Sequence, residues 1–495
     1  MRFFVSKAGG DTMTETKSPD LFGRRVLKSS VRVITPDNVL DVLERARYDH
    51  EKNRSEIEYL WRYYKGEQPI LRRIKKIRPE INNKIVENRA NEIVSFKVGY
   101  LVGEPIQYVG RTNKKATISS ITKLNNLMTC ETKSSRDQEI VEWGMICGTA
   151  YRIVLPKRPL FDGDSPFKIR TLDPRDTMIV YSSGVDEEAL LAAKFARDED
   201  DREIATVYTN DSIYEITDRE IVDTRDNPLG KIPIIEYKAN NARLGAFEVV
   251  LPLLDALNDI DSNRIDGVNQ FIQAFVKFVN CDISTDDFKN LMDLGGLKLK
   301  SLDGMPADAD IVSSELNQTQ TQTLKDDLYN AVLTIVGMPN RNGGSSTSDT
   351  GQAVYMRDGY AAAETSAKAS ENMFRESEIQ TLRLVLKICE TDGVLKLSPA
   401  DIETKFTRRN YDAIQSKAQT LTTMLATDKI HPLLAFTHCG MFSDPEGAYA
   451  LSEDYKKSIA STIGQGSPQK NANGEDNTNQ KTETNGEGTP NNAKE

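Results

Sequence analysis

The sequence lacks the short motifs that identify most enzymes. No GxGxxG or GxxxxGK[ST] stretch is present, which excludes the common glycine-rich loops that hold nucleotide phosphates. The chain has three histidines, His50, His431 and His438, and no serine or cysteine stands in a nucleophile-elbow context. The five cysteines have neither metal-finger nor CxxC spacing, which is typical of buried free thiols in a cytosolic protein. We therefore predict a protein without catalytic residues, bound metal or cofactor.

Long apolar runs and an excess of positive charge are also missing. No stretch approaches the ~20 apolar residues of a membrane span. The opening MRFFVSKAGGDTMTETKS is too short and too polar for a secretory signal. The formal net charge of −10 disfavours a protein that grips nucleic acid over its whole surface, because such binding depends on many Lys and Arg contacts to phosphates. We expect a soluble protein with no membrane partner, present in the cytoplasm when it is made.

Two acidic clusters and one basic stretch leave alternatives open. The DEDD run at 198–201 suggests a two-metal nuclease, although four consecutive acids usually repel one another in a solvated turn. The DIDSNRIDGVNQ run at 259–270 begins like a calcium loop, but Arg264 stands where glycine is needed and Gln270 where glutamate is needed. The basic side chains of LRRIKKIRPEINNK at 71–84 could bind phosphates. The alternatives are that this stretch forms a solvated surface or that it contacts an acidic neighbouring subunit.

Hydrophobic periodicity divides the chain into helical, β and helical parts. The first 35 residues are polar and expected to be loose, and helices are predicted at 36–66 and 82–103. Short runs rich in β-branched and aromatic residues between 150 and 238 are separated by turns such as DGDSP and DNPLG. They predict a mainly antiparallel β region, and the chain as a whole therefore has the pattern of the α+β class.

Long helices dominate the remainder of the sequence. Apolar residues from Val250 to Val279 recur mostly every three or four positions and predict one helix of roughly 50 Å at 247–279. The later segments are a mixed stretch at 280–316, a helix at 317–336, a Gly- and Ser-rich loop at 337–350, a helix ending at about 393, further helices to about 463, and a polar tail. The tail has almost no apolar residue and is expected to be disordered.

Five blocks of the sequence resemble successive parts of the portal proteins of tailed bacteriophages, in the siphophage branch. The blocks are YYKGEQPILRR (63–73), NNKIVENRANEIVSFKVGYLVGEPIQY (82–108), LDPRDTMIVY (172–181), NPLGKIPIIEY (227–237) and LPLLDALNDIDSNRID (251–266). The resemblance covers about 39–393 in the same order. It implies a mainly helical portal fold with a β-rich wing, long stem helices and a C-terminal helical crown, assembled as a cyclic ring.

The resemblance also implies boundaries for the parts of this fold. They are a flexible N-terminus (1–35), a wing of helices and β region (36–246), a first stem helix (247–279), a clip (280–316), a second stem helix (317–336), a tunnel loop (337–350), a long wing helix (351–393), a crown (394–463) and a disordered tail (464–495).

The function implied by the resemblance is that of a DNA channel. About twelve subunits would form a homo-oligomeric ring at one capsid vertex, through which double-stranded DNA passes during packaging and ejection. The implied partners are the terminase large subunit, a head-completion or connector protein, and the major capsid and scaffolding proteins. The implied location is the portal vertex of the virion, after assembly in the host cytoplasm.

Two sets of site residues follow from position in the chain. The residues expected to face DNA are Asn340, Arg341, Asn342, Gly343, Gly344, Ser345 and Ser346, because the loop between the second stem helix and the wing helix is the tunnel loop in such portals. The residues expected to pack the stem against its neighbours are Leu254, Leu257, Ile265, Val268, Ile272 and Phe275, because one narrow apolar stripe cannot be buried within a lone helix hairpin. The alternatives are a non-annular helical adaptor of a virion and a metal-dependent nuclease that uses the acids at 198–201.

Overall fold

A computed structural model describes the chain from residue 18 to residue 464, with gaps. The described residues are 18–76, 79–111, 115–159, 161, 163–272, 275–279, 308–312, 318–340, 359–407, 414–427, 429–442 and 445–464. The chain divides into two compact units, Met1–Ser416 and Lys417–Glu495. Helices and sheets occur together in the larger unit, which confirms the predicted α+β class.

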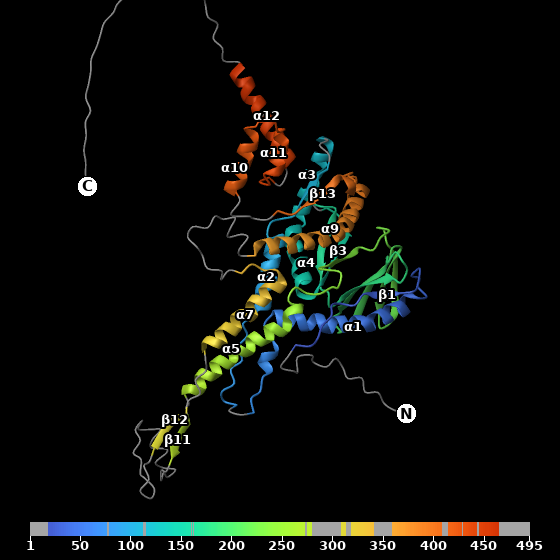
Figure 1. Ribbon diagram of the computed structural model, residues 1–495. Helices are drawn as coiled ribbons and strands as arrows, with labels where there is room; N and C mark the ends of the chain where they lie inside the picture. Colours follow the sequence, from blue (N-terminus) through green and yellow to red (C-terminus); the bar gives the residue numbers. More distant parts are fainter. Residues whose placement is uncertain are drawn as a thin grey trace, which may run out of the picture. The chain divides into compact units, whose positions relative to one another are not determined.

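One layer of the larger unit is a six-stranded sheet in the order β1-β5-β6-β7-β8-β9 (Figure 1). Its strands are β1 (Leu27–Ser29), β5 (Thr177–Ser182), β6 (Ala189–Arg197), β7 (Glu203–Tyr208), β8 (Ser212–Thr217) and β9 (Glu220–Asp226). All neighbouring strands are antiparallel except β1 and β5. The first half of helix α1 (Val39–Tyr64) covers the sheet, since Val42 on its apolar face belongs to the same core as Met178.

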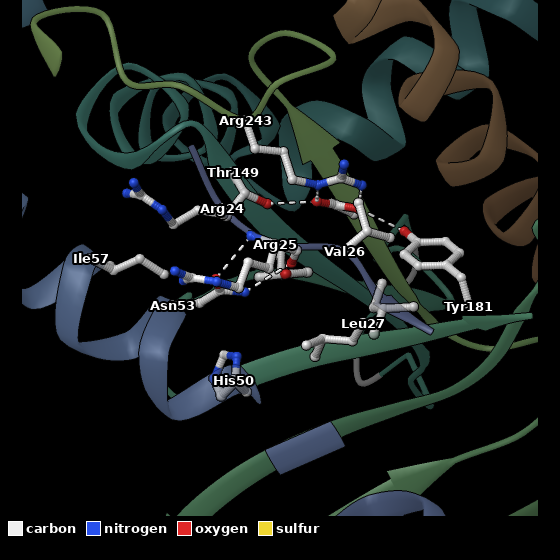
Figure 2. Close-up of a pocket in the computed structure, with 13 residues that line it drawn as sticks. Arg24, Arg25, Val26, Leu27, His50, Asn53, Ile57, Thr149, Tyr181 and Arg243 are labelled. Atoms are coloured by element: carbon white, nitrogen blue, oxygen red, sulfur yellow. Dashed lines mark hydrogen bonds and ion pairs between the residues drawn. The ribbon is translucent and has the colours of Figure 1, made fainter. Parts of the chain in front are cut away.

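Residues 18–35 have a described structure with contacts to the sheet and to neighbouring elements, so the prediction of a loose N-terminus is wrong for them. β1 pairs with β5, and the Arg25 backbone and the Asn53 side chain exchange two hydrogen bonds of 2.9 Å each (Figure 2). The sequence concealed this strand because polar contacts, not an apolar pattern, hold the segment that leads into it. The remainder of the predicted flexible N-terminus, residues 1–17, lies outside the described residues.

The main core lies between a three-stranded antiparallel sheet, in the order β10-β3-β4, and the helices that pack on it. The elements are β3 (Thr149–Pro156), β4 (Phe167–Leu172), β10 (Ile234–Lys238), α2 (Arg89–Val102), α3 (Lys115–Cys130), α4 (Lys133–Cys147) and α9 (Tyr360–Thr391). A strand pair, β2 (Gln107–Gly110) and β13 (Ile402–Lys405), adjoins them. Three short 3-10 helices are η1 (Pro69–Arg72), η2 (Glu248–Val250) and η3 (Pro399–Asp401).

Three of the sequence predictions are confirmed by these elements. The region from 150 to 238 is a set of mainly antiparallel strands, and α1 occupies the helix predicted at 36–66. The end of the helix predicted to about 393 is also confirmed, since α9 ends before Gly393, whose φ of +65° is the left-handed conformation that commonly terminates helices. Residues 351–358 of the predicted wing helix lie outside the described residues.

Other boundaries differ from the predictions. The helix predicted at 82–103 begins only at Arg89, because Asn88 has a left-handed φ of +45° and the preceding residues are extended. Helices α3 and α4 were not predicted. In α4 the buried face carries Lys133 and Asp137, and these charged residues interrupt the apolar periodicity by which a helix is recognised.

The first stem helix is shorter than the predicted 247–279. Helix α5 spans Leu251–Ile272, and Phe275–Val279 forms strand β11, which pairs antiparallel with β12 (Asp308–Val312). Phe275, which was predicted on the helix, therefore lies on a strand. In FVKFV, four of five residues are aromatic or β-branched, so the strand preference of this stretch outweighs the helical spacing of its apolar residues.

The helix predicted at 317–336 is confirmed, while its assignment to a stem stays a prediction. Helix α7 spans Gln318–Val336 and packs beside α5 (Figure 1). Of the predicted clip at 280–316, the structure describes β12 alone, and of the predicted tunnel loop it describes 337–340.

The smaller unit contains α10 (Ile414–Leu425, mostly within it), α11 (Pro432–His438) and α12 (Pro445–Gly464). The predicted crown at 394–463 begins too early, because β13 pairs with β2 and residues up to Ser416 belong to the larger unit. The predicted tail beyond Gly464 lies outside the described residues. Each helix in the described part of the chain is too short or too polar to span a bilayer.

Candidate functional site

Three of the blocks that carry the family resemblance meet on one face of α5. This face, called here the polar face, consists of Asp255, Asn258, Ser262 and Asp266. The four residues recur every three or four positions, so they lie along one side of the helix, and none is more than 9% exposed. A buried polar side chain without a partner costs about 1–3 kcal/mol, so the contacts of this face decide how α5 is held.

The extended segment Asn83–Glu87 binds the polar face through its own backbone. The hydrogen bonds are Asn83 N–H to Asp266 Oδ1 (2.8 Å), Ile85 N–H to Ser262 Oγ (3.0 Å) and Glu87 N–H to Asn258 Oδ1 (2.9 Å). Alternate residues of an extended chain repeat every ~6.6 Å, and residues four apart on a helix repeat every ~6 Å. The two spacings match, which explains why this segment is extended instead of continuing α2 towards the N-terminus.

The N-terminal end of the polar face is closed by hydroxyl and amide donors. The Tyr63 hydroxyl donates to Asp255 at 2.9 Å, and the Ser18 N–H donates to the other carboxylate oxygen at 2.7 Å. Burial raises the pKa of Asp255 above its usual value even though these hydrogen bonds favour the carboxylate. Desolvation is therefore the dominant influence at this end.

The C-terminal end of the polar face is closed by cations. Arg73 lies 3.3 Å from Asp266, and Lys75 forms an ion pair with the same carboxylate. Burial alone would raise the pKa of Asp266, but hydrogen bonds from Lys75 and Asn83 hold it below its usual value. Two of the cations in the basic stretch at 71–84 are thus used inside the chain, which favours a structural role for them over phosphate binding.

Helix α7 lies on a different side of α5. Lys325 Nζ is 2.8 Å from Asp261 of α5 and 3.2 Å from Glu87, so it joins both stem helices to the extended segment. Arg264 donates to Gln322 at 2.8 Å. These contacts fix the pairing of the two helices through polar groups at the end nearer β11 and β12, while Val332, Leu333 and Val336 of α7 enter the main core.

The predicted stem-packing residues fall into separate groups. Leu254 and Leu257 are 3% and 1% exposed and belong to the core of their own chain. Ile265 and Val268 are 41% and 49% exposed, so they are available to a neighbour. The side chains of Ile272 and Phe275 lie outside the described residues.

The tunnel loop is described at its first predicted residue. Asn340 Nδ2 donates to Asn330 Oδ1 of α7 at 2.9 Å, which ties the beginning of the loop to the second stem helix. Arg341, Asn342, Gly343, Gly344, Ser345 and Ser346 lie outside the described residues.

The acidic clusters do not form chemical sites. The acids at 198–201 form the turn between β6 and β7, where Asp198 accepts from the Arg202 N–H at 2.8 Å and Asp201 pairs with Arg197 at 2.8 Å. The stretch 259–270 is helical throughout, so it is no calcium loop. In the described ranges, no group of three or more His, Cys, Asp or Glu side chains is placed to hold a metal ion.

The cysteine and histidine predictions can be placed individually. Cys147, Cys389 and Cys439 are buried free thiols as predicted, but Cys130 is exposed, and Cys281 lies outside the described residues. His431 accepts the Leu433 N–H at 3.2 Å as the N-cap of α11, and His438 is exposed near the end of that helix.

A buried charge network in the main core was not predicted from the sequence. Arg152 of β3 lies 2.6 Å from Asp137 and 3.0 Å from Glu378, and Lys133 lies 2.6 Å and 3.1 Å from the same two acids. Burial opposes ionisation of Glu378, yet the two cations lower its pKa to about 2. Two positive and two negative side chains balance, so the network fixes α9 against α4 and β3 and has a structural role.

The pocket in Figure 2 is also part of the fold and not a ligand site. Its cavity of about 10 Å³ has room for no more than a single water molecule. The Glu236 carboxylate in its wall is satisfied internally, since it accepts from Thr149 at 2.9 Å, Tyr181 at 2.7 Å and Arg243 at 2.6 Å. We therefore take the polar face of α5 as the candidate site, because its contacts fix the position of this helix in the subunit.

The chain matches the family model described as phage portal protein, SPP1 Gp6-like, over residues 43–464. No curated protein matches the chain. Three solved structures are similar to it at 10% identity. The neck of an empty GTA particle computed with C6 symmetry has a TM-score of 0.42 and covers 71% of this chain and 90% of that chain. The virion of a native gene transfer agent (GTA) particle has a TM-score of 0.41, with 71% and 89% covered. The neck of a native GTA particle computed with C12 symmetry has a TM-score of 0.42, with 72% and 91% covered.

Proposed function

The chain belongs to the phage portal protein family, SPP1 Gp6-like, and from this premise we propose that about twelve copies form a closed ring at one capsid vertex. The ring is the channel for double-stranded DNA in packaging and ejection. Proteins of this family are structural, and we assign no enzymatic activity to the chain. Because the sequence lacks a P-loop, ATP hydrolysis is assigned to the terminase that docks on the ring.

One observation carries the ring proposal, and it is the unequal use of the sides of α5. The polar face is satisfied by the chain itself, whereas Ile265 and Val268 of α5 and Leu324 and Ile335 of α7 are 41–55% exposed. Large apolar side chains that recur on paired helices are stabilised by packing against further helices. A cyclic array gives every subunit such a neighbour without leaving a free end.

The acidity of the chain is consistent with passage of DNA as opposed to storage. A strongly basic bore would retain DNA, whereas transport requires weak and replaceable contacts. We assign those contacts to the tunnel loop, in which Arg341 and its asparagine neighbours contact phosphates without sequence preference. Glycines and serines at 343–346 allow each copy of the loop to follow a DNA helix whose symmetry differs from that of the ring.

The partners follow from the same assignment. The ring docks the terminase large subunit during packaging and a head-completion or connector protein afterwards, and it is surrounded by major capsid and scaffolding proteins. Its location is the portal vertex of the virion, after assembly in the host cytoplasm.

Electron microscopy of the purified full chain tests the proposal directly. Rings of about twelve subunits with a bore wide enough for duplex DNA are the expected result. Monomers or filaments at high protein concentration and varied salt would contradict it, and filaments would favour the non-annular adaptor. Magnesium-dependent DNA cleavage that is abolished by alanine at 198–201 would favour the nuclease instead.

Deletion of Gly343–Ser348 tests the channel function separately from assembly. The variant is expected to form rings, because the deleted residues lie beyond α7, but to package less DNA in a reconstituted packaging reaction. Loss of the ring itself would contradict the assignment of this segment as a tunnel loop.

A further inference from the structure

The stem has two exposed surfaces of opposite charge. The first, called here the basic flank, consists of Leu71, Ile74, Lys76 and Lys84 on the segment that covers the polar face of α5. Ile74 is 82% exposed and Leu71 is 42% exposed, and both lysines are exposed beside them. Arg73 and Lys75 of the same segment are already paired with Asp266, so they are not counted in this flank.

The second surface, called here the acidic flank, consists of Leu324, Asp327 and Ile335 on the outer side of α7. Leu324 is 51% and Ile335 is 55% exposed, and the Asp327 carboxylate forms no ion pair within the described residues. At 100° per residue, Asp327 lies roughly 140–160° around α7 from Lys325 and Val332, which face α5 and the core. Leu324 and Ile335 lie roughly 60–100° from the same two residues, at the edge of the outer side. Each flank thus combines exposed apolar side chains with charge of a single sign, positive on the basic flank and negative on the acidic flank.

The two flanks lie on different sides of α5. The segment with the basic flank is anchored on Asp266, and α7 is anchored on Asp261. Five residues separate these anchors, which corresponds to roughly 140° around the helix but only about 8 Å along it. Within one chain the flanks therefore face different directions at nearly the same level of the stem.

We propose that the basic flank of one copy docks against the acidic flank of the next copy in the ring. The inference rests on the proposed ring and names its stem contact. Two different surfaces on opposite sides of one subunit form a heterologous interface, which closes into a ring when each step is a pure rotation. The matching level of the flanks meets that condition, since rotation about an axis roughly parallel to α5 brings them together without a shift along it.

Charge complementarity favours one orientation of neighbouring subunits. Copies with a formal net charge of −10 each repel one another at low salt, so association favours the orientation that brings a local cationic surface onto an anionic one. Lys76 and Lys84 have no ion-pair partner among the described residues, and they face Asp327 of the neighbour in the proposed contact. The apolar members, Ile74 and Leu324, become buried there.

Cross-linking tests the contact in the assembled protein. Ile74→Cys and Leu324→Cys are combined in a chain that also carries Cys130→Ser and Cys281→Ser, and a short bismaleimide is added to purified rings. The expected result is a ladder of covalent oligomers on a denaturing gel. The control replaces Ile74→Cys by Ile118→Cys on α3, which is 46% exposed, close to the 51% of Leu324, and lies outside α5 and α7. This control is expected to remain monomeric on the gel.

The outcomes separate the inference from the proposed function. Rings in the micrographs with monomers on the gel would overturn the flank contact and leave the ring standing. Absence of rings for the unmodified chain would overturn the proposed function itself. A ladder in both the test and the control variant would show random collision and would also count against the inference.

Charge reversal provides an independent measurement. Lys76→Glu with Lys84→Glu is expected to raise the subunit concentration at which rings dissociate by about tenfold at low salt, and less at high salt. Adding Asp327→Lys to this variant is expected to restore much of the loss. Lys231→Glu with Lys396→Glu, at exposed sites outside α5 and α7, makes the same change in net charge and is the control. Equal effects of the stem variant and this control would contradict the contact.

Discussion

The two halves of α5 are held by different kinds of interaction. In the first half, Leu251, Leu254 and Leu257 are 1–3% exposed and belong to the main core. In the second half, from 259 to 269, the described residues include no buried apolar side chain, and the buried residues are Ser262 and Asp266. One helix is thus anchored by apolar burial at its beginning and by hydrogen bonds further along.

This difference shows how a subunit can fix a helix without using its apolar surface. Apolar burial is strong but non-directional, whereas hydrogen bonds are modest in net free energy and specific in geometry. The backbone of Asn83–Glu87 sets the rotation of the second half of α5 through the polar face, and Ile265 and Val268 remain exposed for a neighbour. The first half serves the fold of the subunit, and the second half is prepared for assembly.

The largest expected effect on stability is in the first half of α5, which is buried in the main core. Leu257→Ala removes a side chain that is 1% exposed and leaves a cavity in the main core, which is expected to lower the free energy of unfolding by about 3 kcal/mol. Chemical denaturation of unassembled subunits measures it. A loss below about 1 kcal/mol would mean that the first half of α5 is less important to the core than its burial indicates.

The sequence predicted the paired stem helices but not the end of the first one. The apolar spacing continues from Leu254 through Phe275 to Val279, and spacing alone does not reveal that FVKFV becomes a strand. The choice depends on the pairing of β11 with β12, whose partner residues are 29 to 37 positions away in the chain. The one local signal is the aromatic and β-branched composition of FVKFV, which competes with the helical spacing of the same residues.

The polar face was also beyond prediction from pattern alone. Asp255 and Asp266 were visible as acids away from the apolar stripe of α5, but a polar helix side normally faces water. Asp266 is covered by the segment at 83–87, which contributes backbone N–H groups that every sequence possesses. Asp255 is bound by the Tyr63 hydroxyl and the Ser18 N–H, which are also remote in the chain. The one available signal was the family resemblance, since the blocks at 63–73, 82–108 and 251–266 are those that meet there.

The next effect in size concerns the charged end of the polar face. Asp266→Asn removes the carboxylate that pairs with Arg73 and Lys75 and is expected to destabilise the chain by about 2 kcal/mol near neutral pH. The pKa of Asp266 is lower in the folded chain than the usual value of about 3.9. Its contribution is therefore fully present above about pH 4 and is lost as the pH falls through the folded pKa.

At Asp255 the free energy of unfolding is expected to change with pH in the opposite direction, so this residue serves as the matched control. Its folded pKa is raised, so the folded chain binds the proton more readily than the unfolded chain does. Ionisation of Asp255 lowers the stability of the folded chain. This loss of stability is complete above the folded pKa and disappears as the pH falls to about 4. Unfolding free energies of D255N, D266N and the parent across acidic pH would show differences of opposite sign, and parallel curves would contradict the two environments.

A smaller effect is expected in the middle of the polar face. Ser262→Ala leaves the Ile85 N–H without its 3.0 Å hydrogen bond to Oγ and is expected to destabilise the chain by about 1 kcal/mol. Hydrogen exchange at the Ile85 amide should accelerate, while exchange within β3 should be unchanged. Thr323→Ala on the exposed side of α7 is the control, and an equal response there would show that the effect is not specific to the polar face.

The smallest effect on the subunit is expected where the effect on assembly is greatest. Val268→Ser lies on the second half of α5 at 49% exposure, so the free energy of unfolding of separated subunits should change by less than about 0.5 kcal/mol. In the proposed ring the same side chain would be buried against a neighbour, and its loss should raise the concentration at which rings dissociate, measured by sedimentation. Leu257→Ala should have the larger effect on the free energy of unfolding of the subunit. Val268→Ser should have the larger effect on the concentration at which rings dissociate. If Val268→Ser also unfolds the subunit, the second half of α5 belongs to the chain's own core, and the division of this helix between fold and assembly is wrong.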